Sequence, residues 1–190
     1  MDLDTIQVVV MDGEKVNTHL ITWVRKFPHF TLATDIASKP FPDMVAVWRN
    51  GICAWFLQKT ELDHLLMIDA DMVPLPDTKP VWSEDAPILG CDTVNGRGHR
   101  THDQPGHVGC GCIRMSREAL ESIPKPWFMF EFDDNGLKVT QCECGYFCEK
   151  AMASGFHPVK SGKMGHIMPA VVSPNGDSAH IQLLSRWKKE

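Results

Sequence analysis

Hydrophobic positions in the first part of the chain alternate between two spacings, one typical of strands and one typical of helices. Residues 6–10 form a β-branched run that ends in a turn sequence, and residues 30–34 form a second run, so both segments predict strands. Residues 15–27 and 46–60 carry apolar side chains at helical spacing, and each segment predicts a helix with a buried face. The unbroken run at 65–68 predicts a buried strand. This alternation predicts βαβ units and a parallel sheet.

The second part of the chain is less regular. Residues 90–112 are rich in glycine, histidine and polar side chains, and they predict long irregular loops. Ser116 is a favourable N-cap, so a helix is predicted over residues 116–123. Residues 144–156 predict another helix, with Gly155 as the signal for its end.

Composition narrows the class of protein. The chain has 190 residues, of which 43% are hydrophobic and 23% are charged, as is typical of one globular domain with a substantial core. The formal net charge of −5 argues against binding of nucleic acid through bulk electrostatics. No apolar run approaches the ~20 residues that span a bilayer, and the first residues do not resemble a signal peptide, so a cytoplasmic location is expected. The seven cysteines are then expected to be thiols.

Two aspartates directly follow the buried strand at 65–68. In an extended segment Asp69 and Asp71 point to the same side, roughly 6.6–7 Å apart along the chain. Two such carboxylates repel each other and are costly to bury, unless a hard divalent cation such as Mg²⁺ or Mn²⁺ binds them. Such sites usually complete their coordination with water and substrate phosphate, so the pair predicts a metal–diphosphate site. The alternative is a solvated turn in which one acid caps the next element.

Four segments resemble, in order, motifs of the GT-A glycosyltransferases of the family 2 type. HLLMIDADMVP (64–74) resembles the strand and D-x-D motif, and VAVWRNGICAWFLQ (45–58) resembles the R-N helix that precedes it. GHVGCGCIRMSREALESIPKPWF (106–128) is similar to the acceptor loop and its following helix. ECGYFCEKAMASGFHPVKSGKMGHI (143–167) is similar to the stretch that runs from the E-D pair to the late histidine.

The resemblance implies a single α/β domain over residues 1–190, GT-A-like, with a central mostly parallel or mixed sheet flanked by helices. Residues 1–89 would form the nucleotide-sugar-binding half, and residues 90–190 the half that carries the acceptor site and the metal-binding histidine. The implied activity is the metal-dependent transfer of a sugar from a nucleoside-diphosphate sugar to an acceptor, which could be a glycan, a protein or a small molecule.

The resemblance also implies roles for particular residues. Asp71 and His166 would bind Mn²⁺ or Mg²⁺, and Asp69 would lie beside the metal and the ribose. Lys163 would assist at the phosphates, and Arg49, of the R-N pair, is assigned to donor binding. The bound ion would neutralise charge on the departing nucleoside diphosphate.

The nucleotide base and the catalytic base are less well matched. The first strand departs from the family pattern, so Asp12 and Asp35 are the candidates for the nucleotide-base site, and either could equally be a turn or cap residue. The family has Glu-Asp before the F-C helix, whereas this chain has Glu143 followed by Cys144. A thiol cannot accept a proton as a carboxylate does, so Glu143 is the candidate general base if the reaction inverts at the anomeric carbon. The alternatives are a retaining reaction, another acid such as Asp133 or Asp134, and lost chemistry.

Two further hypotheses concern the cysteines and the aromatic residues. The C-G-C at 110–112 and the C-E-C at 142–144, with Cys148, His107 and His157 nearby, could hold a structural zinc ion, although zinc sites usually use C-x₂₋₄-C spacing. The protein would then be a zinc-stabilised interaction domain. Besides an active transferase and a zinc-stabilised domain, the chain could be a catalytically degenerate nucleotide-sugar-binding domain. Trp127 and Phe128 are expected to stack on a sugar face.

Overall fold

The protein is built around one mixed seven-stranded sheet. The computed structural model describes residues 2–11, 16, 18–36, 45–95 and 106–166. The strand order is β2-β1-β3-β6-β5-β9-β4. The strands are β1 Ile6–Met11, β2 His29–Leu32, β3 His64–Asp69, β4 Met72–Pro74, β5 Ile88–Asn95, β6 Cys112–Ser116 and β9 Val159–His166. β1 pairs parallel with β2 and β3, and β5 pairs parallel with β9, whereas β6 and β4 run antiparallel to their neighbours.

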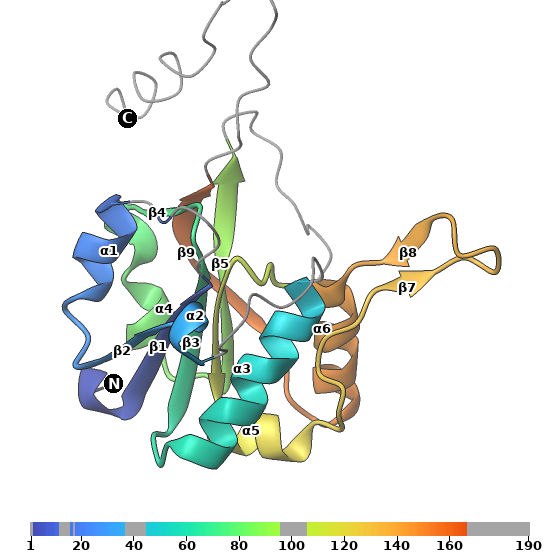
Figure 1. Ribbon diagram of the computed structural model, residues 1–190, viewed down its shortest axis with the longest axis horizontal. Helices are drawn as coiled ribbons and strands as arrows, with labels where there is room; N and C mark the ends of the chain where they lie inside the picture. The colour runs from blue at the N-terminus through green and yellow to red at the C-terminus, as the bar shows by residue number, and fades with distance from the viewer. Residues whose placement is uncertain (1, 12–15, 17, 37–44, 96–105, 167–190) are drawn as a thin grey trace, which may run out of the picture.

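Helices cover both faces of this sheet (Figure 1). On one face lie α2 Ala33–Ile36, α3 Val45–Lys59, α5 Arg117–Ser122 and α6 Glu143–Ala153. On the other face lie α1 Thr18–Val24 and α4 Pro80–Ser83. Short 3-10 turns, Leu3–Thr5 and Pro76–Thr78, precede β1 and α4. Within the described ranges, no helix has both the length and the apolar character needed to cross a bilayer.

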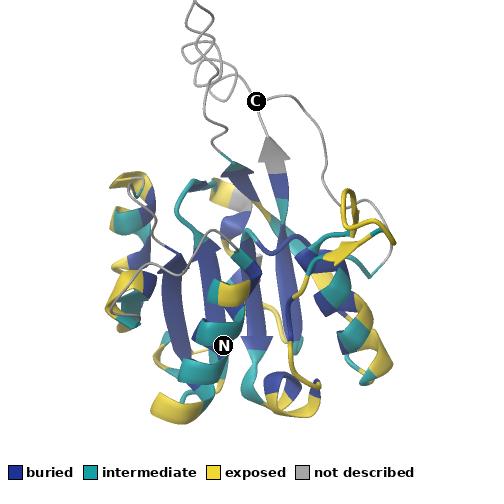
Figure 2. Cartoon of the chain, turned by 45° about the vertical axis from the view of Figure 1, so that its right-hand side comes forward, coloured by how far each residue is buried: buried dark blue, intermediate teal, exposed yellow. Residues whose placement is uncertain are grey.

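The predicted strands at 6–10 and 65–68 are confirmed, and both are buried on their two faces. All six residues of β1 are buried, as are the four central residues of β3. Figure 2 shows these strands as the buried centre of the molecule. A sheet covered on both sides selects continuous apolar runs rather than alternating ones, which is the pattern of both segments.

The predicted helix ends at 116 and 155 are also confirmed. The Ser116 hydroxyl accepts a hydrogen bond from the backbone N–H of Ala119 at 3.1 Å, which satisfies an otherwise free donor in the first turn of α5. Gly155, directly after the C-cap of α6, has φ of 87°, a left-handed conformation that glycine adopts without steric cost.

The prediction of irregular loops over 90–112 is wrong at both ends. β5 continues to Asn95, and β6 begins at Cys112. Likewise the predicted strand at 30–34 ends at Leu32, because Ala33 begins α2. β5 and β9 carry glycine and polar residues, and they are strands because neighbouring strands pair with them on both sides.

A two-stranded hairpin lies outside the main sheet. β7 Glu131–Phe132 pairs antiparallel with β8 Val139–Gln141. It projects from the body beside the start of α6 and is exposed over most of its length (Figures 1 and 2).

Candidate functional site

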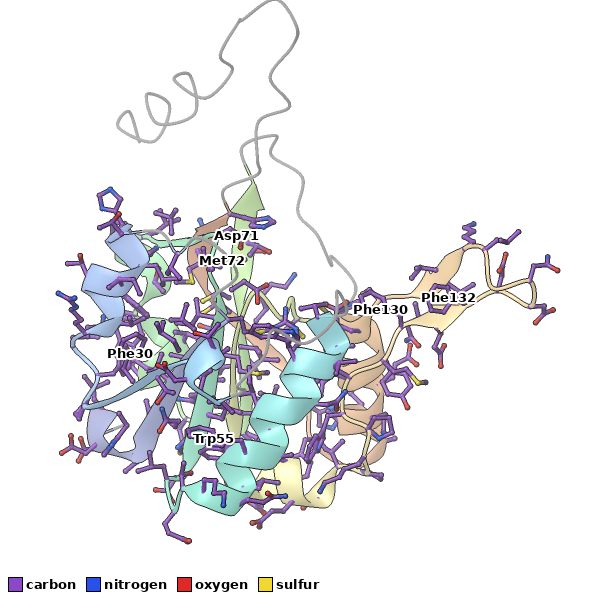
Figure 3. The ribbon with its side chains drawn as sticks, in the orientation of Figure 1. Phe30, Trp55, Asp71, Met72, Phe130 and Phe132 are labelled. Carbon is purple, nitrogen blue, oxygen red and sulfur yellow. The ribbon has the colours of Figure 1, made fainter. Side chains whose placement is uncertain are left out.

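One edge of the main sheet collects the polar side chains that the sequence singles out. β3, β5 and β9 run in the same direction, so their carboxyl ends share this edge, and the antiparallel β6 starts there. Asp69 ends β3 and His166 ends β9. In open α/β sheets, ligands bind outside the carboxyl ends of the strands. Figure 3 shows Asp71 next to Met72 at this edge, whereas Trp55, in the second half of α3, lies toward the opposite end of the sheet.

Asp71 and His166 are in direct contact. His166 Nε2 lies 2.8 Å from Asp71 Oδ2, although the two residues are 95 positions apart in the sequence. The pairing of β4 with β9 explains the contact, because it sets Met72 opposite His166 and so brings the preceding Asp71 beside the imidazole. The hydrogen bond to Asp71 raises the pKa of His166 above its ordinary value, against the opposing effect of burial.

Arg49 fixes the second carboxylate. Its side chain is only 2% exposed, and its Nη2 donates to Asp69 Oδ2 at 3.0 Å. Nη1 donates to the carbonyl oxygen of Cys110 at 3.0 Å. Burial would lower the pKa of Arg49, but the Asp69 carboxylate raises it above the ordinary value. Burial raises the pKa of Asp69, and Arg49 opposes this rise. The buried Arg49 therefore contacts Asp69 from the protein interior.

The carboxylates of Asp69 and Asp71 fit a divalent cation. The Oδ1 atom of each residue is buried, and neither atom has a hydrogen-bond partner among the described residues. Leaving a buried carboxylate oxygen unpaired is costly. A hard cation beside the two oxygens would remove this cost, and carboxylate oxygen with imidazole is a suitable ligand set for Mn²⁺.

Gly111 lets the loop before β6 lie directly against this pair. Its carbonyl oxygen accepts the backbone N–H of Asp69 at 2.8 Å. A Cβ atom at this position would lie 2.1 Å from the Met72 Cε and 3.5 Å from Asp69 Oδ2. A side chain at this position would have to displace the flexible end of Met72.

Glu143 also lies beside Arg49. It is the first residue of α6 and is 9% exposed. Its Oε1 lies 3.9 Å from Arg49 Nε and 3.5 Å from the Cys144 sulfur, which donates to it. A hydrogen bond with Cys110, together with burial, raises the pKa of Cys144 well above its ordinary value. A thiol with a raised pKa is a poor substitute for the aspartate of the GT-A motif.

The other residues assigned to the donor are placed as follows. Lys163 is exposed on β9, three residues before His166, and its carbonyl oxygen accepts the Thr78 hydroxyl at 2.7 Å. Asp35 is exposed in the first turn of α2. Asp12 lies outside the described residues.

The structure does not bring the alternative acids to this edge. Asp133 Oδ1 accepts the backbone N–H groups of Leu137 and Lys138, at 2.9 and 3.2 Å, and so closes the turn of the projecting hairpin. Asp134 is exposed in the same turn.

The expectation that Trp127 and Phe128 stack on a sugar is wrong. They are 2% and 1% exposed, and both belong to the core. The Trp127 indole N–H donates to the carbonyl oxygen of Leu120 at 2.9 Å, and Phe128 stacks on Phe147. Their apolar area is therefore used inside the protein.

The C-G-C segment cannot supply two ligands to one metal ion. Cys110 packs in the core on the α3 and α6 side of the sheet, whereas Cys112 packs on the α1 and α4 side. Residues 110 and 111 form a turn before β6, so the i, i+2 spacing does not put both side chains on one face, and the sheet separates the two sulfurs.

Asp92 is a residue that the sequence reasoning missed. It lies on β5, and its Oδ1 is 3.9 Å from Lys160 Nζ on the neighbouring β9. The predicted loop over 90–112 concealed it. A signal was present in the sequence. Asp92 follows the largely apolar segment 88–91, just as Asp69 follows the apolar run 65–68.

Comparisons with known proteins identify the fold. No protein-family model matches the chain, and no curated protein matches it. Among solved structures, A197 from STIV is 20% identical with a TM-score of 0.59, covering 90% of this chain and 91% of that one. The inositol-1-phosphate CTP transferase from T. maritima is 10% identical with a TM-score of 0.52, covering 99% of this chain and 98% of that one.

A third structure is a mutant Drosophila β-1,4-galactosyltransferase 7 in complex with manganese, UDP-Gal and xylobiose. It is 14% identical with a TM-score of 0.56, covering 97% of this chain and 79% of that one. At these identities the similarity concerns the fold, and the expected GT-A-like α/β fold with a mixed sheet is confirmed.

Proposed function

We propose that this protein is a metal-dependent glycosyltransferase that moves a sugar from a nucleoside-diphosphate sugar to an acceptor hydroxyl. The observation that carries the proposal is the meeting of Asp69, Asp71 and His166 at the carboxyl edge of the sheet. Two of their buried oxygen atoms have no hydrogen-bond partner among the described residues. These side chains offer ligand atoms for a cation but too few of them to complete its coordination. This supports binding of an ion that a further ligand, such as a diphosphate, also coordinates.

In this proposal Asp71 and His166 hold Mn²⁺ or Mg²⁺, and Asp69 lies beside the ion and the ribose. The ion would act as a Lewis acid toward the departing diphosphate. Arg49 acts indirectly, because it is buried behind Asp69 and fixes the orientation of that carboxylate. The direct donor contacts would come instead from Lys163 at the phosphates and from Asp12 or Asp35 at the nucleotide base.

Glu143 is the proposed general base for an inverting reaction. It would take the proton of the acceptor hydroxyl as the oxygen attacks the anomeric carbon, while the bond from that carbon to the diphosphate breaks. Arg49 lies 3.9 Å from Glu143 and 3.0 Å from Asp69, so one guanidinium links the proposed base to the proposed metal site. A retaining reaction would not need this base.

Domain organisation and location complete the proposal. Residues 1–89 would carry the nucleotide-sugar part of one domain over residues 1–190, and residues 90–190 would carry the acceptor part and His166. All seven cysteines are free thiols, which supports work in a reducing compartment such as the cytoplasm. The acceptor would be a glycan, a protein or a small molecule.

Thermal unfolding with a panel of donors tests the proposal. UDP-, GDP- and other nucleoside-diphosphate sugars are added with and without Mn²⁺, and at least one should raise the melting temperature only when Mn²⁺ is present. Asp71→Asn should abolish this effect. Asp63→Asn is the matched control, because Asp63 is an exposed acid before the opposite end of β3. A panel in which no nucleotide stabilises the wild type with Mn²⁺ would refute the proposal.

Product analysis separates an active enzyme from a catalytically degenerate binding domain. The second alternative arises because Cys144 stands where the GT-A motif has an aspartate. Slow release of a nucleoside diphosphate from the stabilising donor, abolished by Glu143→Gln, indicates glycosyl transfer. If a donor raises the melting temperature but no nucleoside diphosphate is released with any acceptor tested, the protein is a binding domain. CTP and UTP with sugar phosphates are included, because the T. maritima structure of this fold is a CTP transferase, and release of pyrophosphate would indicate nucleotidyl transfer.

A further inference from the structure

A second group of potential metal ligands lies at the start of α6, beside Arg49. Cys142 is the N-cap of α6, and Glu143 and Cys144 are its first residues. One ligand atom from each of these three residues lies within 4.8 Å of the others. His107, from the loop before β6, places its Nε2 3.9 Å from the Cys142 sulfur. Three side chains at the start of α6 therefore converge here, and His107 approaches one of them, Cys142.

Backbone N–H groups donate to both sulfurs of this group. The backbone N–H of Gly145 donates to the Cys142 sulfur at 3.4 Å, and the backbone N–H of Cys110 donates to the Cys144 sulfur at 3.3 Å. A bound metal ion would have to displace the proton of the buried Cys144 thiol, whose pKa is raised well above its ordinary value.

We propose that Cys142, Cys144, Glu143 and His107 form a zinc site, separate from the hard-cation site at Asp69 and Asp71. Two sulfurs, one imidazole nitrogen and one carboxylate oxygen are a ligand set that Zn²⁺ accepts in tetrahedral geometry. Around such an ion, neighbouring ligand atoms lie about 3.3–3.8 Å apart, given Zn–S near 2.3 Å and Zn–N or Zn–O near 2.0 Å. The three ligand atoms at the start of α6 lie within 4.8 Å of one another and would draw closer on binding. His107, whose Nε2 is 3.9 Å from the Cys142 sulfur, would have to move toward the other two ligand atoms.

The site gives zinc a regulatory effect, and this part of the inference rests on the proposed glycosyl transfer. Glu143 is the proposed general base, and a carboxylate bound to Zn²⁺ cannot accept the proton of an acceptor hydroxyl. Zinc at this site would therefore inhibit transfer while Mn²⁺ or Mg²⁺ still occupies the other site. The two sites differ in ligand softness, because thiolates select Zn²⁺ over Mg²⁺ or Mn²⁺.

Zinc binding is measured on the reduced full chain by competition with a chromogenic chelator, and Co²⁺ is used as a spectroscopic substitute. We expect one zinc ion bound through sulfur, with a thiolate-to-Co²⁺ charge-transfer band. Cys142→Ser should weaken zinc affinity by about tenfold or more, since one of four ligands is lost. Cys142 is partly exposed, so this variant should fold. Cys91→Ala is the matched control, because that buried thiol packs on the opposite face of the sheet.

The outcomes separate this site from the proposed function. Asp71→Asn should keep the sulfur-bound zinc while losing the effect of Mn²⁺ with nucleotide. Absence of a thiolate band in the wild type, or equal zinc affinity in Cys142→Ser and wild type, overturns the zinc site whatever the donor panel shows. A zinc site without any nucleotide effect overturns the proposed function alone. Once a donor is found, zinc should inhibit its Mn²⁺-dependent breakdown in the wild type and far less in Cys142→Ser; equal inhibition of both overturns the regulatory part.

Discussion

Replacing Arg49 with methionine tests whether the candidate site depends on the buried guanidinium group of this residue. Methionine keeps much of the length and apolar volume of the side chain but removes the guanidinium. The Asp69 carboxylate then loses its partner at 3.0 Å, and the carbonyl oxygen of Cys110 loses a donor at 3.0 Å.

The magnitude follows from the burial of the pair. Removing one partner of a buried ion pair costs about 3–5 kcal/mol, because the remaining charge is left uncompensated. The Asp69 side chain is 26% exposed, so water can partly replace Arg49, and the lower end of this range applies. We expect the free energy of unfolding to fall by about 3 kcal/mol, which for a chain of this size lowers the melting temperature by about 6–12 °C.

Urea unfolding followed by tryptophan fluorescence measures this loss, since the chain has six tryptophans. A double-mutant cycle with Asp69→Asn isolates the pair, and we expect a coupling energy of about 2 kcal/mol. Arg114→Met is the matched control. Arg114 is also buried, but its Nη2 donates to the carbonyl oxygens of Glu84 and Ala86, so its loss should not couple to Asp69→Asn. A coupling energy below about 0.5 kcal/mol for Arg49 and Asp69 would refute the reasoning.

Three further predictions concern a glycine, a titrating histidine and a helix cap. Gly111→Ala should lower the free energy of unfolding by about 1–3 kcal/mol and weaken Mn²⁺ binding, because the new methyl group displaces Met72; unchanged urea midpoint and Mn²⁺ affinity would contradict this. Burial and Arg114 lower the pKa of His64 from 6.5, and its Nδ1 is buried without a partner among the described residues, so the unfolded chain binds the proton more tightly. The free energy of unfolding should therefore fall as pH drops below about 6.5, and His64→Gln should make that fall shallower; an equal slope would count against the assignment. Ser116→Ala should lower the melting temperature by about 2–4 °C through loss of the α5 cap, whereas Ser116→Asp should retain it.

Local sequence was enough to predict part of the candidate site. Asp69 and Asp71 were selected because two acids follow a buried apolar run, and this reasoning uses only a few neighbouring residues. The Asp71–His166 contact, by contrast, depends on the pairing of β4 with β9 across most of the chain. His166 was selected only through resemblance to a family, since nothing near it in the sequence indicates an acid partner.

The sequence by itself determined the buried strands at 6–10 and 65–68, the α3 helix and the ends of α5 and α6. Each depends on local spacing or on a cap within one turn, which acts before any distant contact forms. Only the tertiary structure decided that β5 and β9 are strands, that Arg49 contacts both Asp69 and Glu143, and that Trp127 and Phe128 are core residues. The physical reason is the same in each case: the decisive partner is distant in the sequence, and its pairing or burial outweighs the local preference.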